Sequence, residues 1–169
     1  MEVKLNPVME YGKRQADAIG CLRQHGHIEP TLLLLYAAID TMAWLSVPEE
    51  ESTGRDFQSW VDKYMLDVNR ALLPDVTAVD LWGARCGLLH TGAPESRDFR
   101  KGNARKIFYT SNVEVVAELP ADVVLVSIEN LGRAFAAALT WFVADLDDDE
   151  ERAEVARQKI GRILVHRAV

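Results

Sequence analysis

The chain has 169 residues, of which 49% are hydrophobic and 27% are charged, and its formal net charge is −7. These values are ordinary for a soluble globular protein, and the length suits one substantial core, so we expect a single domain over residues 1–169. The acidic balance excludes attraction of nucleic acid to the whole surface, and any contact with RNA would therefore need a local basic patch.

The two cysteines, Cys21 and Cys86, lie far apart in the sequence and show no metal-ligand spacing. The N-terminal segment has neither the basic start nor the apolar stretch of a signal peptide. We therefore predict a cytoplasmic protein with free thiols, no cofactor and no metal site. His25 and His27 flank Gly26, but they would need further ligands to hold a metal ion.

Three helices are predicted in the first part of the chain. The first covers residues 6–24, and Pro7 suits its start because the first turn leaves that amide without a partner in any case. The second covers residues 31–46 and is apolar nearly all round, which indicates a central place in the bundle. Asp40 interrupts it, and it is shorter than the roughly 20 residues that span a bilayer, so we expect no membrane segment. The third helix, 55–66, is amphipathic.

A fourth helix is predicted over residues 77–91, where a glycine and then a proline follow and stop it. Two extended segments come next, at 106–110 and 113–118. A Ser-Asn pair between them suits a tight turn, and together they predict a β-hairpin.

From residue 121 to 145 the apolar residues return to helical spacing and predict another long helix. The acidic run 147–151 leads into a last, charged helix that reaches about residue 166. We interpret this run as a solvated cap that favours the N-terminus of the helix, rather than as a metal site. The predicted fold is mainly α, a compact helical bundle with one small β-hairpin insertion.

Arg85 and His90 lie close together at the end of the fourth predicted helix. A permanently charged guanidinium beside an imidazole that exchanges protons near neutral pH suits chemistry on a phosphodiester. On a helical wheel the two residues are about 140° apart, which allows a shared site without demanding one. A structural alternative for His90 is a histidine that interacts with the last carbonyls of its helix.

Asp40 is the one charge in the apolar second helix, and a buried carboxylate needs a partner. Arg85, which Leu81 and Leu88 flank on the wheel, is the natural candidate. The pair is then either a structural link between two helices or a device by which Asp40 orients Arg85 for a phosphate, and the two interpretations are compatible.

Gly83, Cys86 and Gly87 form a smooth stripe on the same helix. A glycine inside a helix costs about 1 kcal/mol relative to alanine, so two of them indicate a closely apposed backbone. That neighbour would belong either to the same chain or to a second subunit.

The order of these parts resembles the HEPN superfamily, the higher-eukaryote and prokaryote nucleotide-binding helical domains. Their shared pattern is an arginine, four to six further residues and a histidine near the end of a late helix of a compact bundle. It corresponds here to Arg85 and His90, and the apolar segment 32–41 resembles the core helix of the family. The resemblance covers roughly residues 5–92 and, less clearly, the last two helices.

The resemblance implies a metal-independent endoribonuclease, a toxin or a defence or stress effector, that needs no cofactor. It also implies a homodimer in which the arginines and histidines of two chains meet, with an antitoxin or another protein as a further partner. His90 would then be the general base at the ribose 2′-hydroxyl or the general acid at the leaving 5′-oxygen, and Arg85 would stabilise the pentacoordinate phosphate. Cys86 departs from the family, which often has a polar residue such as asparagine after the arginine. The alternative is therefore an inactive module that binds RNA, a nucleotide or a protein.

A short basic segment follows the motif and provides candidate RNA contacts. Aromatic residues nearby, among them Phe108, suit stacking on bases. The alternative is a solvated loop that balances an acidic surface. The candidate RNA-binding residues are Arg97, Arg100, Lys101, Arg105 and Lys106.

Overall fold

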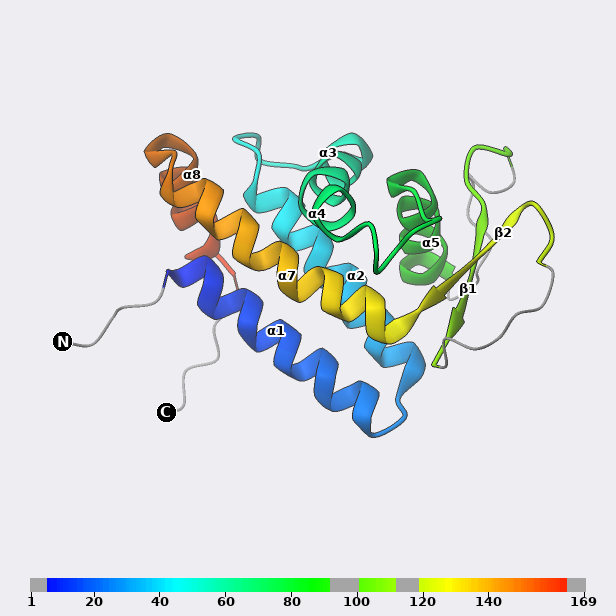
Figure 1. Ribbon diagram of the computed structural model, residues 1–169. Coiled ribbons are helices and arrows are strands. Elements are labelled where there is room, and N and C mark those ends of the chain that lie inside the picture. Colours follow the sequence, from blue (N-terminus) through cyan, green and yellow to red (C-terminus); the bar gives the residue numbers. More distant parts are fainter. Residues whose placement is uncertain (1–5, 92–100, 112–118, 164–169) are drawn as a thin grey trace.

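The computed structural model describes residues 6–91, 101–111 and 119–163. Helices make up most of this part, and two short strands lie together at one end of the molecule (Figure 1). The mainly helical class is therefore confirmed. The elements are α1 (Pro7–Gln24), α2 (Ile28–Leu45), α3 (Gly54–Trp60), the π-helix η1 (Val61–Leu66), α4 (Asp67–Asn69), α5 (Ala78–Thr91), β1 (Lys106–Thr110), β2 (Val123–Ser127), α7 (Ile128–Asp147) and α8 (Glu150–Ile160).

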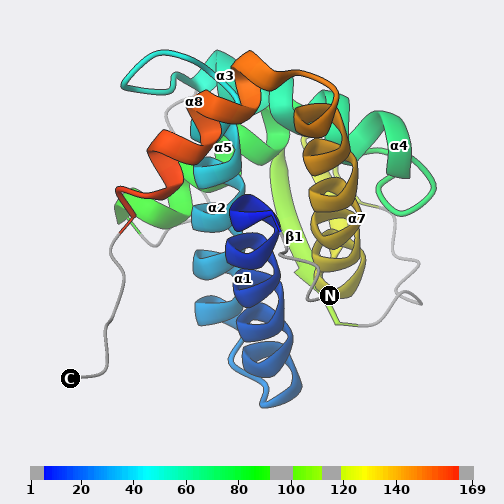
Figure 2. The same cartoon turned by 90° about the vertical axis from the view of Figure 1, so that its left-hand side faces the viewer.

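The long helices α1, α2 and α7 pack together as the body of the bundle (Figure 2). α1 begins where predicted, because the Asn6 side chain accepts a hydrogen bond from the amide of Val8 at 3.0 Å and Pro7 occupies the first turn. α1 approaches α7 closely at Gly12, where an added Cβ would come within 2.7 Å of the Leu139 side chain. Space and not backbone conformation therefore favours glycine at that crossing, because a larger residue would require the Leu139 side chain to shift.

The predicted third helix is α3 continued by η1. α3 starts at a capping box in which Thr53 and Asp56 bond to each other's backbone amides. The wider turn of η1 places Tyr64 in the core, where its ring lies 5.5 Å from Trp60 and 5.3 Å from Phe142, measured between centroids. This aromatic cluster joins α3 and η1 to α7.

The two strands that the structure describes form a parallel pair and not the predicted β-hairpin. β1 has the predicted bounds, but its partner is β2, and the two strands run parallel with Lys106 opposite Val123. The predicted second strand, 113–118, lies outside the described residues. A parallel pair requires a connection of about a dozen residues, which 111–122 provides.

The helix predicted from residue 121 therefore begins only at Ile128. The segment Val123–Ser127 is a short apolar run rich in β-branched valine, and such a run fits a buried strand as well as a helix. Val124 and Val126 alternate into the core and Ser127 caps α7 by accepting from the amide of Asn130 at 3.3 Å. The strand thus ends where the helix cap begins.

The acidic run before the last helix acts as predicted, because Asp149 is the N-cap of α8 and accepts from the Arg152 amide at 3.1 Å. α8 ends at Ile160, short of the predicted end. Its buried Lys159 donates to the carbonyls of Trp44, Val47 and Glu49 at 2.6 to 2.8 Å. This lysine holds α8 against the C-terminal end of α2.

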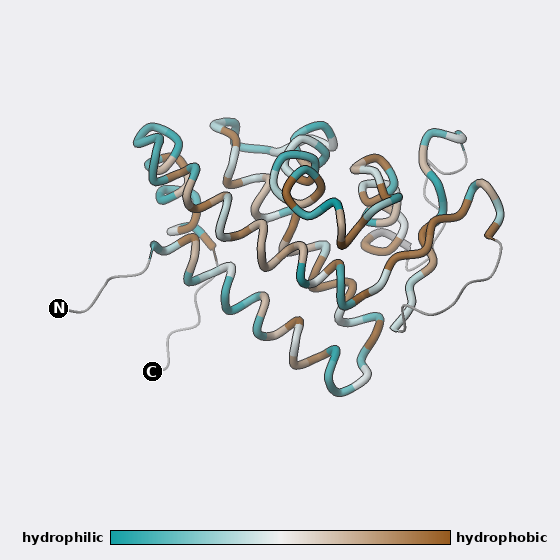
Figure 3. Tube along the Cα trace, viewed as in Figure 1, coloured by the Kyte–Doolittle hydropathy of each residue, from teal (hydrophilic) through white to brown (hydrophobic). Residues whose placement is uncertain are grey.

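α2 is, among the described residues, the one helix whose length and hydropathy suit a membrane span. Half of that window is buried inside the protein, as in a core helix. Hydrophilic residues are frequent along α8 and the neighbouring 49–51 loop, while β2 is hydrophobic (Figure 3).

Candidate functional site

The helix that carries Arg85 and His90 is fixed at its N-terminus by a second capping box. The Thr77 amide donates to Asp80 at 3.1 Å, and the Asp80 amide donates back to the Thr77 hydroxyl at 3.2 Å. This Thr-x-x-Asp pattern just before an apolar run is a signal in the sequence that marks the start of the helix. It places α5 in a defined position along the bundle.

Arg85 of α5 and Asp40 of α2 form the predicted ion pair. The Arg85 Nε donates to Asp40 Oδ2 at 3.0 Å, and the Nη2 group donates to the same oxygen. The side chains are 18% and 25% exposed, so the pair lies at the edge of the core and not inside it. Burial alone would lower the pKa of Arg85, but the hydrogen bond and charge of Asp40 outweigh it and raise that pKa. The guanidinium therefore stays charged.

Trp82, about one turn before Arg85 on α5, contacts the Arg85 guanidinium. The Arg85 Cζ lies 5.1 Å from the centroid of the Trp82 ring, within the range of a cation–π contact. The same ring packs on Phe57 at 5.3 Å between centroids and on the backbone of Gly54. Nothing in the sequence distinguishes Trp82 as a site residue, because a tryptophan on an apolar helix is ordinary core composition.

His90 is in the last turn of α5, but its side chain lies outside the described part of the structure. The distance between its imidazole and Arg85 therefore stays a prediction.

The face of α2 that carries Asp40 is partly exposed to solvent. Although α2 is strongly apolar, Leu33 is 39% exposed, and Ala37 beside it is exposed too. Their helical spacing places them on one face with Asp40. We call this face the α2 stripe; it consists of Leu33, Ala37, Asp40, Thr41 and Trp44.

The glycine stripe of α5 is covered within the chain. Gly83 and Gly87 are both buried, whereas Cys86 is half-buried. α3 and β1 pack against α5. The close neighbour that the glycines indicated therefore belongs to the same chain, and the stripe requires no second subunit.

The predicted RNA-binding residues of the basic segment differ in their surroundings. The backbone amide and the guanidinium of Arg105 each donate to Asp80 at 2.7 Å, and Arg105 also donates to the Asp75 carbonyl. Lys101 is exposed and Lys106 is half-buried at the start of β1. Arg97 and Arg100 lie outside the described residues.

Asp80, absent from the predicted site, is the centre of this polar network. Its carboxylate is buried, and burial alone would raise its pKa, but hydrogen bonds from Arg105 and Thr77 outweigh that effect and lower the pKa. Beneath it, the hydroxyls of Tyr36 and Tyr109 lie 2.6 Å apart, and burial raises the pKa of both. The network joins β1 to the N-terminal end of α5.

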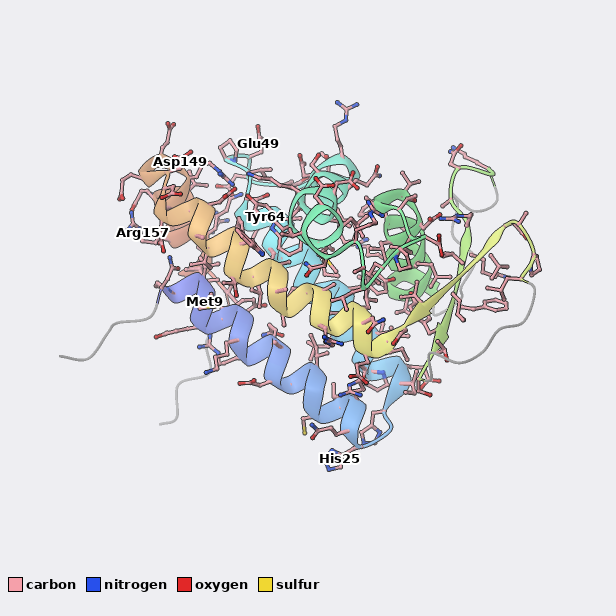
Figure 4. All side chains as sticks on the ribbon, in the orientation of Figure 1. Met9, His25, Glu49, Tyr64, Asp149 and Arg157 are labelled. Atoms are coloured by element: carbon pink, nitrogen blue, oxygen red, sulfur yellow. The ribbon has the colours of Figure 1, made fainter. Side chains whose placement is uncertain are left out.

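Within the described residues, no three His, Cys, Asp or Glu side chains are placed to hold a metal ion. His25 and His27 stack with ring centroids 6.5 Å apart at the turn between α1 and α2. This turn lies far from α8, as the position of His25 in Figure 4 shows.

Comparisons with protein-family models, with curated proteins and with solved structures give no match to the chain. The fold and the site together define a mainly helical protein with a small two-stranded parallel sheet and a charged pair between two helices.

Proposed function

We propose that this protein is a cytoplasmic, HEPN-like endoribonuclease that acts without a metal ion and as a homodimer. Arg85 and His90 are its catalytic residues, and Asp40 positions Arg85. The observation that carries the proposal is the partly exposed, charged guanidinium of Arg85, which forms an ion pair with Asp40 of α2. His90 follows Arg85 on the same helix, within two turns.

The reaction is transesterification at a phosphodiester. An imidazole takes the proton of the ribose 2′-hydroxyl, and the resulting oxygen attacks phosphorus. As the bond to the 5′-oxygen breaks, a second imidazole protonates that oxygen, so the products are a 2′,3′-cyclic phosphate and a free 5′-hydroxyl. Arg85 stabilises the additional negative charge on the pentacoordinate phosphate, a task that suits a permanently charged fork of donors.

The α2 stripe supports the homodimer. It presents apolar side chains around a charged pair, which is the composition of a surface that another protein covers. A second copy docked on this stripe and on the end of α5 would bring two His90 residues to one substrate, so that one acts as base and the other as acid.

RNA would reach this site along the basic segment. Arg105 is bound to Asp80, so the candidate contacts reduce to Lys101 and Lys106, with Arg97 and Arg100 as further predicted contacts. Phe108, which is 46% exposed on β1, provides a stacking surface beside them. As a toxin or a defence or stress effector, the enzyme would be held inactive by an antitoxin or another protein partner.

A second candidate is an inactive HEPN-like module that binds RNA, a nucleotide or a protein. Cys86 favours it, because it follows Arg85 where the family often has a polar residue.

The deciding experiment is cleavage of a mixed RNA pool in EDTA by the wild type, His90→Ala and His25→Ala. His25 is an exposed histidine at the turn between α1 and α2 and is the matched control. We expect cyclic phosphate ends from the wild type and from His25→Ala, and none from His90→Ala. Failure of folded wild-type protein to cleave, or full activity of His90→Ala, would reject the ribonuclease and leave the binding module.

A further inference from the structure

The sheet has two strands within the described residues, so β2 has one edge without a neighbouring strand. The Lys106 amide donates to the carbonyl of Asp122 at 2.8 Å, and from there the register is continuous to the ends of both strands. In a parallel ladder this first bond fixes the pattern, so that Val124 and Val126 direct their amides and carbonyls toward β1. Leu125, which lies between them, directs its N–H and C=O to the other edge.

These outward backbone groups of Leu125 have no hydrogen-bond partner in the part of the chain that the structure describes. The backbone hydrogen bonds outside the helices and the strand ladder include neither of them. The Leu125 side chain is half-buried on the outer face of the sheet, opposite Phe108. A strand edge with a free donor and a free acceptor is a template on which a further strand can pair.

A pocket of about 290 Å³ lies between β2 and the segment 71–76, which precedes α5. Leu72, Leu73 and Val76 line it on one side and Leu125 on the other. Leu73 and Val76 are buried, so the floor of the pocket is apolar. The volume is at the lower limit of the roughly 300 to 1,000 Å³ that hold whole small ligands, and it suits one apolar side chain of a larger partner.

Asp75 gives the rim of this pocket a negative charge. It lines the pocket and is exposed. Its backbone carbonyl accepts from Arg105, but its carboxylate forms no ion pair or hydrogen bond within the described residues. The carboxylate therefore favours a cation beside the apolar side chain that fills the pocket.

We propose that the free edge of β2 binds an extended segment of another protein as a third strand. The segment places one apolar side chain in the pocket and a lysine or arginine at Asp75. A free N–H and C=O on one residue match an extended backbone, whose own donors and acceptors alternate in the same way. A second copy that paired through its own β2 would bring no cation, since β2 contains no lysine or arginine. The site is separate from Arg85 and His90 and does not depend on cleavage of RNA.

The first test measures amide hydrogen exchange in the full chain, without a ligand. We expect the Leu125 amide to exchange about 100-fold faster than the amides of Val124 and Val126, which donate to β1. Equal protection of the three amides would show that the chain itself covers the edge and would overturn the proposal. Protection of Leu125 that rises with protein concentration would assign the edge to a second copy, and would overturn it too.

The second test uses fluorescence anisotropy with synthetic heptapeptides as probes. The first peptide alternates leucine with threonine between two terminal lysines; one control has alanine for leucine and another has glutamate for lysine. We expect each control to bind at least 10-fold more weakly. Two further peptides are N-methylated on alternate amides, so that the methyl groups of one face β2 and those of the other face away. Only one of the two should lose binding. Loss in both or in neither, or no binding of the first peptide at millimolar concentration, overturns strand addition.

Variants of the protein give the matched comparison. Leu125→Pro removes the outward N–H without removing a bond to β1, a position at which an edge strand accepts proline. It should abolish binding of the lysine peptide, while Leu125→Ala, which keeps the N–H, should bind within a few fold of wild type. Asp75→Lys should reverse the preference between the lysine and glutamate peptides. Unchanged binding by Leu125→Pro rejects the site. If that variant does not fold, the unchanged preference of Asp75→Lys is the result that rejects it.

Discussion

At the scale of single residues, the Asp40–Arg85 pair is the feature on which both stability and the proposed activity depend. Breaking a buried ion pair costs more than the pair contributes, because one charge is left without a partner. Here both side chains are partly exposed, so water reduces that cost.

We expect Arg85→Met to lower the free energy of unfolding by about 2 kcal/mol, below the range for fully buried pairs. Asp40→Asn combined with Arg85→Met should lose less than the sum of the two single changes, because the double variant strands no charge. Urea unfolding of the four proteins measures this coupling. Additive losses would show that the two side chains do not interact in solution.

Asp80 gives the protein a specific response to acid. Its folded pKa lies below its unfolded value, so the unfolded chain takes up the proton first as the pH falls. The contribution of Asp80 is therefore complete above about pH 4, the unfolded pKa, and is lost as the pH falls through the lower folded pKa. Asp56 and Asp145 have pKa values shifted in the same direction and add to this acid limb.

Asp80→Asn should lower the free energy of unfolding by about 3 kcal/mol at pH 7, because Arg105 loses a charged partner that is buried. The difference from wild type should shrink steadily below about pH 4. Thermal unfolding of both proteins from pH 7 to pH 2 measures it, with Asp75→Asn, an exposed neighbour, as the control. A difference that is independent of pH would contradict the role assigned to the Asp80 charge.

At the scale of secondary-structure elements, glycines inside the long helices have opposite roles. A Cβ at Gly12 would come within 2.7 Å of the Leu139 side chain on α7, but a Cβ at Gly20 or Gly132 meets nothing within 4 Å. Gly20 and Gly132 both line a hollow of about 200 Å³ between α1 and α7. Neither has a positive φ, so neither space nor conformation requires glycine there.

We expect Gly20→Ala and Gly132→Ala each to stabilise the fold by about 0.5 to 1 kcal/mol, since alanine loses less backbone entropy in a helix. Gly12→Ala should instead destabilise it by about 1 to 3 kcal/mol, because Leu139 must move. Denaturant midpoints of the three variants decide the matter. Equal effects at positions 12 and 20 would mean that the α1–α7 crossing is looser than the structure indicates.

At the scale of the whole molecule, the acidic 49–51 loop and the two strands lie at opposite ends. The acidic residues of the 49–51 loop and of α8 gather at one end, where Figure 4 labels Glu49 and Asp149. β1, with Lys106 at its start, lies at the opposite end (Figure 1).

The α2 stripe makes a prediction about assembly. Leu33→Glu should convert the proposed dimer to monomer at micromolar concentration, because it places a charge in an apolar interface. Val68→Glu is the matched control, since Val68 is 41% exposed on α4 and away from the stripe. Light scattering measures the mass of each protein and circular dichroism its fold. A wild-type monomer, or a Leu33→Glu dimer, would reject the stripe as the dimer interface.

The sequence by itself determined the helices, because apolar periodicity and local caps act within a few residues. Asn6 with Pro7 marked the start of α1, and the acidic run before α8 was correctly interpreted as its cap. The partnership of Asp40 with Arg85 also followed from the sequence, since a lone carboxylate in an apolar helix has few partners available.

Only the tertiary structure decided what depends on residues distant in the chain. The pairing of β1 with β2 is parallel, and an apolar run such as Val123–Ser127 does not state its partner or its direction. Arg105 was predicted as an RNA contact, but the fold places its guanidinium on Asp80. Helix caps and apolar periodicity depend on residues that are close together in the sequence. The contacts named here form only when the whole chain has packed.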